Sequence, residues 1–114
     1  MHALIRLAVI GSSLGASLGG TLASAAAEGK PSIDEGRALL ETNCSSCHAT
    51  AKTGASPLAK APQFRTLKQK YPLENLGEAL AEGIMTGHPA MPQFVFNPAQ
   101  IESILSYLDS ISEP

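Results

Sequence analysis

Residues 44–48 read Cys44-Ser45-Ser46-Cys47-His48 and contain both cysteines of the 114-residue chain. Two thiols one helical turn apart can add to the two vinyl groups on one edge of a single porphyrin. The histidine that follows then lies beneath the ring, where its imidazole can bind the iron. This C-x-x-C-H pattern is typical of covalent haem attachment. We therefore predict that Cys44 and Cys47 bind a haem and that His48 is one axial ligand of its iron.

Two other uses of the cysteine pair are less consistent with the sequence. A disulfide or a redox-active C-x-x-C does not require the histidine, and no βαβ pattern surrounds the motif. A zinc site needs four ligands, whereas the chain offers only His48 and His88 beside the two cysteines, at poor spacing. The haem interpretation is favoured over both.

The N-terminal segment carries no charge from Leu7 to Ala27 and follows Arg6. It ends in a run of small residues that fits the cleavage rule of a secretory signal. Its many glycines and serines make it weakly apolar for a permanent membrane helix, although an uncleaved anchor of this length remains the alternative. We predict a cleavable signal peptide over residues 1–27, cut after Ala25 or Ala27, and one domain over residues 28–114.

The remaining domain is short, and a chain of this size buries only a thin core by itself. A covalently bound haem supplies a large apolar plate for side chains to pack against. We expect the haem-free chain to be poorly folded. Export also fits the cysteines, because thioether bonds to a haem remove the disulfide that an oxidising compartment would otherwise favour.

Helical periodicity predicts the elements around the motif. Ser32-Ile33-Asp34-Glu35 has the pattern of a capping box and should start a helix that runs to about Asn43, with Ile33, Gly36 and Leu40 facing inward. Glycine is costly inside a helix, so Gly36 indicates the close approach of another element.

Three further helices follow in the sequence. Pro62 should start a short one with Phe64, Leu67 and Tyr71 on one face. Another is expected from about Leu73 to Thr86. Asn97 as N-cap and Pro98 at the first position open the last one. Its buried side repeats through Ile101, Ile104, Leu105, Leu108 and Ile111. With no strand-like alternation, the sequence predicts an all-α domain.

The loop over residues 49–62 comes directly after His48. A ligating histidine usually donates its other ring N–H to a nearby acceptor. A backbone carbonyl near Ser56-Pro57-Leu58 is well placed in the sequence for that role, although Pro57 could equally be an ordinary loop proline.

The second axial ligand has three candidates, Met85, His88 and Met91. Met85 falls inside the predicted third helix, where a core position suits it better. His88 would be the stronger ligand and would give a bis-histidine haem. Met91 lies between Pro89 and Pro92, which restrict the backbone and lower the entropy lost in holding a weak thioether bond. We predict Met91.

Taken together, residues 32–112 resemble the small bacterial class I c-type cytochromes. The resemblance rests on the C-x-x-C-H motif with Gly36 and Leu40 upstream, on residues 87–94 (Gly-His-Pro-Ala-Met-Pro-Gln-Phe), and on residues 104–108 (Ile-Leu-Ser-Tyr-Leu). It implies about four short helices around one covalent haem c, with the first and last helices crossing.

The resemblance also implies particular roles for residues of this chain. Cys44 and Cys47 would form thioethers, with iron ligation by His48 and Met91. Gly36 and Leu40 would meet the Tyr107 region at the helix crossing, and Pro57 falls where the family's acceptor of the histidine N–H would be. The chain departs from the family in lacking tryptophan, and it offers only Arg65 and Tyr71 as weak candidates to bind the haem propionates.

A haem with both axial positions filled exchanges one electron and leaves no site for a substrate. We therefore expect a monomeric periplasmic electron carrier rather than an enzyme, with no nucleic-acid partner. A haem subunit of a larger dehydrogenase or oxidase complex is the first alternative, and a haem enzyme or gas-binding protein with a displaceable ligand is the second.

Redox proteins, a donor and an acceptor, are the expected partners. Loss of Arg6 with the signal peptide leaves a net negative domain. Nevertheless, no acidic residue occurs between Thr42 and Leu73, where five basic ones do. These are Lys52, Lys60, Arg65, Lys68 and Lys70. Such a basic rim would steer an acidic partner towards the haem, although it could equally be a solvated loop.

Overall fold

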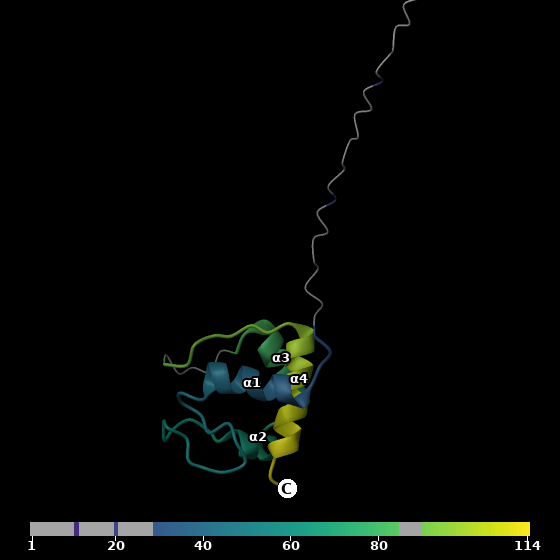
Figure 1. Cartoon of the computed structure of the whole chain (residues 1–114). Helices are drawn as coiled ribbons and strands as arrows, with labels where there is room; N and C mark the ends of the chain where they lie inside the picture. The colour runs from purple at the N-terminus through teal and green to yellow at the C-terminus, as the bar shows by residue number, and fades with distance from the viewer. Residues whose placement is uncertain (1–10, 12–19, 21–28, 85–89) are drawn as a thin grey trace, which may run out of the picture.

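The structure is a computed structural model that describes residues 11, 20, 29–84 and 90–114. In these residues it contains four α-helices, one short 3₁₀ helix and no strand, so the all-α prediction is confirmed. The elements in chain order are α1 (Ile33–Cys44), the 3₁₀ helix η1 (Phe64–Thr66), α2 (Leu67–Lys70), α3 (Leu73–Glu82) and α4 (Pro98–Ile111). Figure 1 shows α1 crossing α4, with α3 and α2 near opposite ends of α4. The predicted signal peptide lies outside the described residues except at positions 11 and 20.

The start of α1 is attached to α4 through one buried hydroxyl. Ser32 caps the helix by accepting a hydrogen bond from the Glu35 amide at 3.1 Å. The second bond of the predicted capping box, from the Ser32 amide to the Glu35 side chain, does not form. Instead the Ser32 amide donates to Ser103 Oγ at 3.0 Å, and Ser103 Oγ lies 3.2 Å from a Glu35 carboxylate oxygen. Ser103 is completely buried, so the cap is completed by the neighbouring helix.

The crossing of α1 and α4 depends on Gly36. A Cβ atom built on Gly36 would lie 2.0 Å from the backbone oxygen of Ser103, which confirms the predicted close approach. Leu40, one turn later, is buried in the core. The prediction that Ile33 also faces inward is wrong, because this first residue of α1 precedes the contact with α4 and is 49% exposed.

The core forms where these helices meet. Its buried members are Leu40, Phe64, Leu80, Phe96, Ile104, Tyr107, Leu108 and Ile111. The Tyr107 hydroxyl is satisfied by donating to the Thr50 carbonyl at 2.7 Å, so the loop after His48 is fixed to α4. The structure thus brings Gly36, Leu40 and the Tyr107 region together, as the family resemblance implied.

The two middle helices differ in extent from the prediction. The short helical segment begins at Phe64 rather than at Pro62, and it ends at Lys70. Tyr71 then adopts extended backbone angles and is 58% exposed, so its predicted inward position is wrong. Helix α3 ends at Glu82 rather than Thr86, because Gly83 turns the chain with a φ of 90°.

Helix α4 begins as predicted. Asn97 and Gln100 form a complete capping box, with bonds of 2.8 and 3.0 Å, and Pro98 occupies the first turn. Across the described ranges, no helix combines the length and apolar character needed to cross a membrane.

Candidate haem site

The C-x-x-C-H motif lies on the turn that ends α1. The Cys44 carbonyl accepts hydrogen bonds from the amides of Cys47 at 3.2 Å and His48 at 2.9 Å. These bonds wrap the five residues into one helical turn, so both thiols and the imidazole belong to a single compact unit. Both thiols are free and partly buried. The sequence prediction that these three residues form one site is consistent with this geometry.

The thiol of Cys44 is held in its neutral form. Burial, and to a smaller extent the nearby Cys47, raises its pKa to about 11. At neutral pH the free Cys44 thiol is therefore protonated. In addition, no cluster of three or more Cys, His, Asp and Glu side chains is found within residues 29–84 and 90–114. The zinc alternative therefore has no ligand set in that part of the chain.

One backbone oxygen determines which nitrogen of His48 is available to a metal. His48 Nδ1 lies 2.7 Å from the Pro62 carbonyl oxygen. A carbonyl can only accept a hydrogen bond, so the proton of the neutral ring is on Nδ1 and the lone pair is on Nε2. The Phe64 ring lies beside the imidazole, with 4.7 Å between ring centroids. His48 is thus oriented and left with one nitrogen ready to bind iron.

The acceptor is not the one expected from the sequence. We predicted a carbonyl near Ser56-Pro57-Leu58, with Pro57 implied by the family resemblance, and this prediction is wrong. Ser56 Oγ instead accepts a hydrogen bond from the Ala49 amide at 3.0 Å, and the Leu58 amide donates to the Cys47 carbonyl at 3.1 Å. These bonds fold the first part of the loop against the motif's own backbone. Pro62 then reaches the ring on the returning part of the loop.

The segment after Pro62 is fixed by further backbone contacts. The Phe64 amide donates to the Ala49 carbonyl at 3.0 Å. The Gln63 carbonyl accepts bonds from the amide and the hydroxyl of Thr66. The Pro62 oxygen is therefore presented by an ordered stretch of chain rather than by a free loop.

Met91 lies on a separate segment, the connection between α3 and α4, and is half-buried. This segment is anchored by the Phe96 amide, which donates to the Leu80 carbonyl at 3.3 Å. The Gln93 side chain also packs closely on Gly83, where an added Cβ would lie 2.3 Å from the Gln93 amide nitrogen. The other two candidate ligands, Met85 and His88, lie outside the described residues.

The basic residues of the loop region have different roles in the structure. Arg65 binds Glu113, and Lys68 is paired with Asp109 on α4. Lys52, Lys60 and Lys70 are exposed, and none of them forms an ion pair with another described residue. Of the five residues of the predicted basic rim, three therefore carry a charge without an acidic partner among the described residues.

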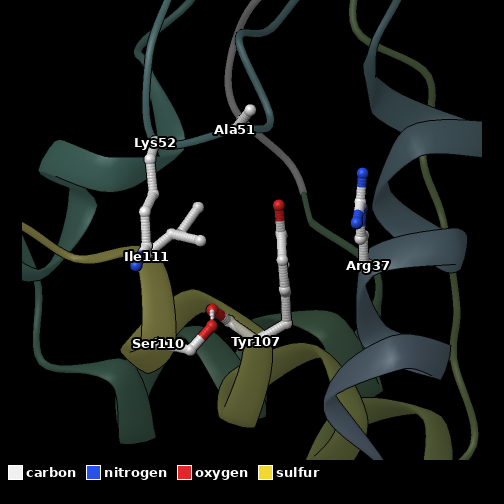
Figure 2. A pocket seen from close by; sticks show the side chains of 6 residues that line it. All are labelled: Arg37, Ala51, Lys52, Tyr107, Ser110 and Ile111. Atoms are coloured by element: carbon white, nitrogen blue, oxygen red, sulfur yellow. Dashed lines mark hydrogen bonds between the residues drawn. The ribbon is translucent and has the colours of Figure 1, made fainter.

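A shallow pocket of about 270 Å³ lies beside the crossing of α1 and α4 (Figure 2). Tyr107 stands between Arg37 and Lys52, and Ser110 and Ile111 form one side. Arg37 donates to Glu41 at 2.8 Å, so its charge is largely compensated. None of the four predicted haem-site residues lines this pocket.

The chemistry of the motif fits a covalent haem. Two free thiols on one turn could form thioethers, and the adjacent imidazole could offer Nε2 to an iron while the Pro62 carbonyl holds the ring. A bound haem would supply the exchange of one electron at its iron. The protein residues would hold the haem and fix the imidazole.

Comparison with known proteins agrees with this chemistry. The Cytochrome c family model matches residues 33–112, which is most of the chain. Searches of curated proteins and of solved structures found no match. The chain therefore belongs to the cytochrome c family, as an all-α mono-haem class I member that binds haem c covalently and transfers electrons.

Proposed function

We propose that this protein is an exported, periplasmic electron carrier, with residues 1–27 removed as a signal peptide and residues 28–114 forming the haem domain. Cys44 and Cys47 form the thioethers, and His48 and Met91 are the axial ligands. The observation that carries the proposal is the hydrogen bond from His48 Nδ1 to the Pro62 carbonyl. It leaves Nε2 free on the residue that directly follows two free thiols in the chain, which supports its role as a proximal haem ligand.

Ligation by Met91 is supported by its surroundings. Its segment begins beyond Gly83 and is attached to α3 by the Phe96–Leu80 hydrogen bond. A thioether is a weak, soft ligand that stabilises ferrous iron and raises the reduction potential. With both axial positions occupied, the iron can change oxidation state with little movement of its ligands, and no coordination position is left for a substrate.

The two alternatives differ in properties that can be observed. A haem subunit of a larger dehydrogenase or oxidase complex would have the same iron ligands but a permanent partner. The large apolar side chains that are exposed in the described part are Ile33, Leu58, Tyr71 and Val95, and a continuous patch of them would favour such a complex. An enzyme or gas-binding protein would instead require an open or displaceable position at the iron.

Visible spectroscopy of the haem-loaded protein tests the ligands directly. The full chain is expressed in a host that attaches haem c, and spectra of both oxidation states are recorded with and without carbon monoxide. We expect a low-spin spectrum, the weak red band of a thioether–ferric bond, and no binding of carbon monoxide. Mass spectrometry of the exported protein should show loss of the first 25 or 27 residues.

Substitution of the two candidate methionines identifies the ligand. We expect Met91→Ala to lose the red band and to gain carbon monoxide binding, because its iron has an open position. Met85→Ala is the matched control and should keep the wild-type spectrum. A wild-type protein that is high-spin and binds carbon monoxide would contradict the electron-carrier proposal and would favour the enzyme or gas-binding alternative.

A further inference from the structure

Arg65 is the most enclosed of the basic side chains that form ion pairs in the described residues, with 13% of its side chain exposed. Its guanidinium has two acceptors. Nη1 donates to the Gly54 carbonyl at 2.8 Å, and Nε donates to Glu113 Oε1 at 3.1 Å. The Glu113 amide in turn donates to the Arg65 carbonyl at 2.9 Å. Arg65 and Glu113 are thus joined through both backbone and side chains.

These contacts connect three parts of the chain that are distant in sequence. Gly54 lies in the loop that follows His48, at a position with φ of 96°. Glu113 lies just beyond the end of α4. Arg65 belongs to η1, directly after Phe64 and three residues after Pro62. The guanidinium therefore joins Gly54, within the 49–62 loop, to η1, which follows that loop, and connects both to Glu113 at the end of α4.

The stretch from Pro62 to Arg65 also makes the two contacts of the His48 imidazole ring described above. Pro62 accepts the Nδ1 proton, and the Phe64 ring lies beside the imidazole. Arg65 follows Pro62 and Phe64 closely in the chain, so its contacts add to the backbone bonds that hold this stretch in place. We propose that Arg65, held by Glu113, is a positioning residue for His48: it maintains the hydrogen bond from Nδ1 to the Pro62 carbonyl and thereby lowers the reduction potential of the haem iron. This inference rests on the proposed ligation of iron by His48.

The direction of the effect follows from the basicity of the ligand. A firm hydrogen bond from Nδ1 makes the imidazole a stronger electron donor, which stabilises ferric iron over ferrous iron. Weakening that bond should raise the potential. Simple loss of a positive charge near the haem would instead lower the potential, because ferric iron carries one more positive charge than ferrous iron and is stabilised when a neighbouring positive charge is removed. The sign of the change therefore separates positioning from electrostatics.

Lysine offers a variant that preserves the charge. An ammonium group is a compact point charge, whereas the guanidinium is a planar fork that reaches two acceptors at once. Lysine at position 65 cannot reproduce both the Gly54 and the Glu113 contacts. Arg65→Lys therefore breaks the bridge without changing the net charge.

The test uses the haem-loaded full chain and two measurements that do not depend on activity. Spectroelectrochemistry gives the reduction potential, and nuclear magnetic resonance of the ferrous protein gives the exchange rate of the His48 Nδ1 proton. For Arg65→Lys we expect a higher potential and exchange at least about tenfold faster, because loss of a guanidinium contact loosens the backbone that presents the Pro62 carbonyl. Glu113→Gln removes the carboxylate charge that Arg65 binds but keeps a side-chain oxygen. It should change the potential and the exchange rate in the same direction, by smaller amounts.

Lys68 and Asp109 provide matched controls, because they form an exposed ion pair between α2, which follows η1, and α4. Lys68→Arg keeps the charge, and Asp109→Asn removes the same charge as Glu113→Gln. Both should leave proton exchange at the wild-type rate, and Glu113→Gln should raise the potential more than Asp109→Asn does.

The outcomes distinguish this inference from the function on which it rests. A wild-type protein without a histidine-ligated low-spin haem contradicts the proposed function itself. A wild-type protein with the expected spectrum, combined with unchanged potential and proton exchange in Arg65→Lys and Glu113→Gln, overturns the positioning role alone. A lower potential in Arg65→Lys would also overturn it.

Discussion

At the scale of single residues, one backbone carbonyl and one glycine position the predicted haem-binding residues. The Pro62 carbonyl oxygen selects the tautomer of His48, and the single hydrogen that replaces a side chain at Gly36 allows α1 to touch the backbone of α4. The first contact determines which nitrogen can bind iron. The second places the end of α1, and with it the C-x-x-C-H turn, relative to the rest of the core.

The Gly36 contact predicts a large loss of stability on adding one methyl group. In Gly36→Ala the new Cβ would meet the Ser103 backbone, which cannot move without shifting α4. We expect the free energy of unfolding to fall by about 2–3 kcal/mol, the upper part of the range for overpacked sites. Thermal unfolding of the haem-loaded protein should then have a midpoint lower by roughly 10 °C or more.

Gly77 is the matched control for this experiment. It also lies inside a helix and faces α4, but a Cβ there would meet only side-chain atoms, of Leu105 at 3.1 Å and of Ile101 at 3.6 Å. A flexible side chain can move, and alanine gains up to about 1 kcal/mol in helix propensity over glycine. Gly77→Ala should therefore change stability little. Equal losses in both variants would show that backbone contact is not what makes Gly36 necessary.

At the scale of elements, the end of α3 controls the segment that contains Met91. Gly83 stops the helix with a positive φ, and Gln93 packs against the space where a side chain would be. The Phe96 amide bonds to the Leu80 carbonyl one turn before this stop. The position of the Met91 segment thus depends on a glycine and a glutamine, neither of which is itself a candidate ligand.

Gly83→Ala should weaken ligation by Met91. The substitution imposes a left-handed backbone on alanine, which costs about 1–3 kcal/mol, and it displaces Gln93. We expect release of the thioether of Met91, the proposed ligand, to relieve that strain, so added imidazole should bind ferric iron with about tenfold higher apparent affinity. The measurement is a titration of the red band with imidazole.

Gly54→Ala is the control for backbone strain, because Gly54 also has a positive φ but a Cβ there would meet nothing within 4 Å. It lies in the loop after His48 rather than beside Met91, and it should leave the imidazole affinity near that of the wild type. The same affinity in Gly83→Ala and wild type would argue against control of Met91 by the end of α3.

At the scale of the whole molecule, ion pairs decide which basic residues are available to a partner. Arg65 and Lys68 form ion pairs with Glu113 and Asp109, whereas Lys60 is exposed in the loop that follows His48 in the sequence. The chain as a whole is acidic, with ten acidic residues against eight basic ones. A local positive surface in a net negative protein can still steer an anionic reactant to one side of it.

Charge reversal at Lys60 tests this steering. In Lys60→Glu we expect oxidation of the ferrous protein by hexacyanoferrate(III), an anionic one-electron oxidant, to be about tenfold slower at low ionic strength. The difference from wild type should shrink as salt is added, because screening shortens the range of the field. The measurement is stopped-flow absorbance over a series of salt concentrations.

Lys30→Glu is the control because it changes the net charge equally. Lys30 precedes α1, and the C-x-x-C-H turn lies at the other end of that helix, which is roughly 18 Å long. We expect a smaller effect on the rate. If both variants slow the reaction equally, net charge rather than a local surface governs the encounter.

Features that depend on residues close together in the chain could be predicted from the sequence. The capping residues of α1 and α4, the inward position of Leu40 and the single C-x-x-C-H turn all follow from residues a few positions apart, because helix formation and thioether spacing are local. Gly36 could be predicted as a contact point since a glycine is costly in a helix interior without such a reason. The family and its haem c follow from the same patterns.

Contacts between residues that are distant in the chain became known only from the three-dimensional fold. Nothing near Pro62 in the sequence distinguishes its carbonyl from those of residues 56–58. The Pro62 carbonyl accepts the His48 hydrogen bond because the loop folds back on Cys47 and Ala49. Likewise, Arg65 is 48 residues from Glu113, and no local pattern pairs them. The physical reason is that hydrogen bonds and ion pairs depend on positions in space, which long-range packing sets, whereas periodicity and spacing record only the order of residues along the chain.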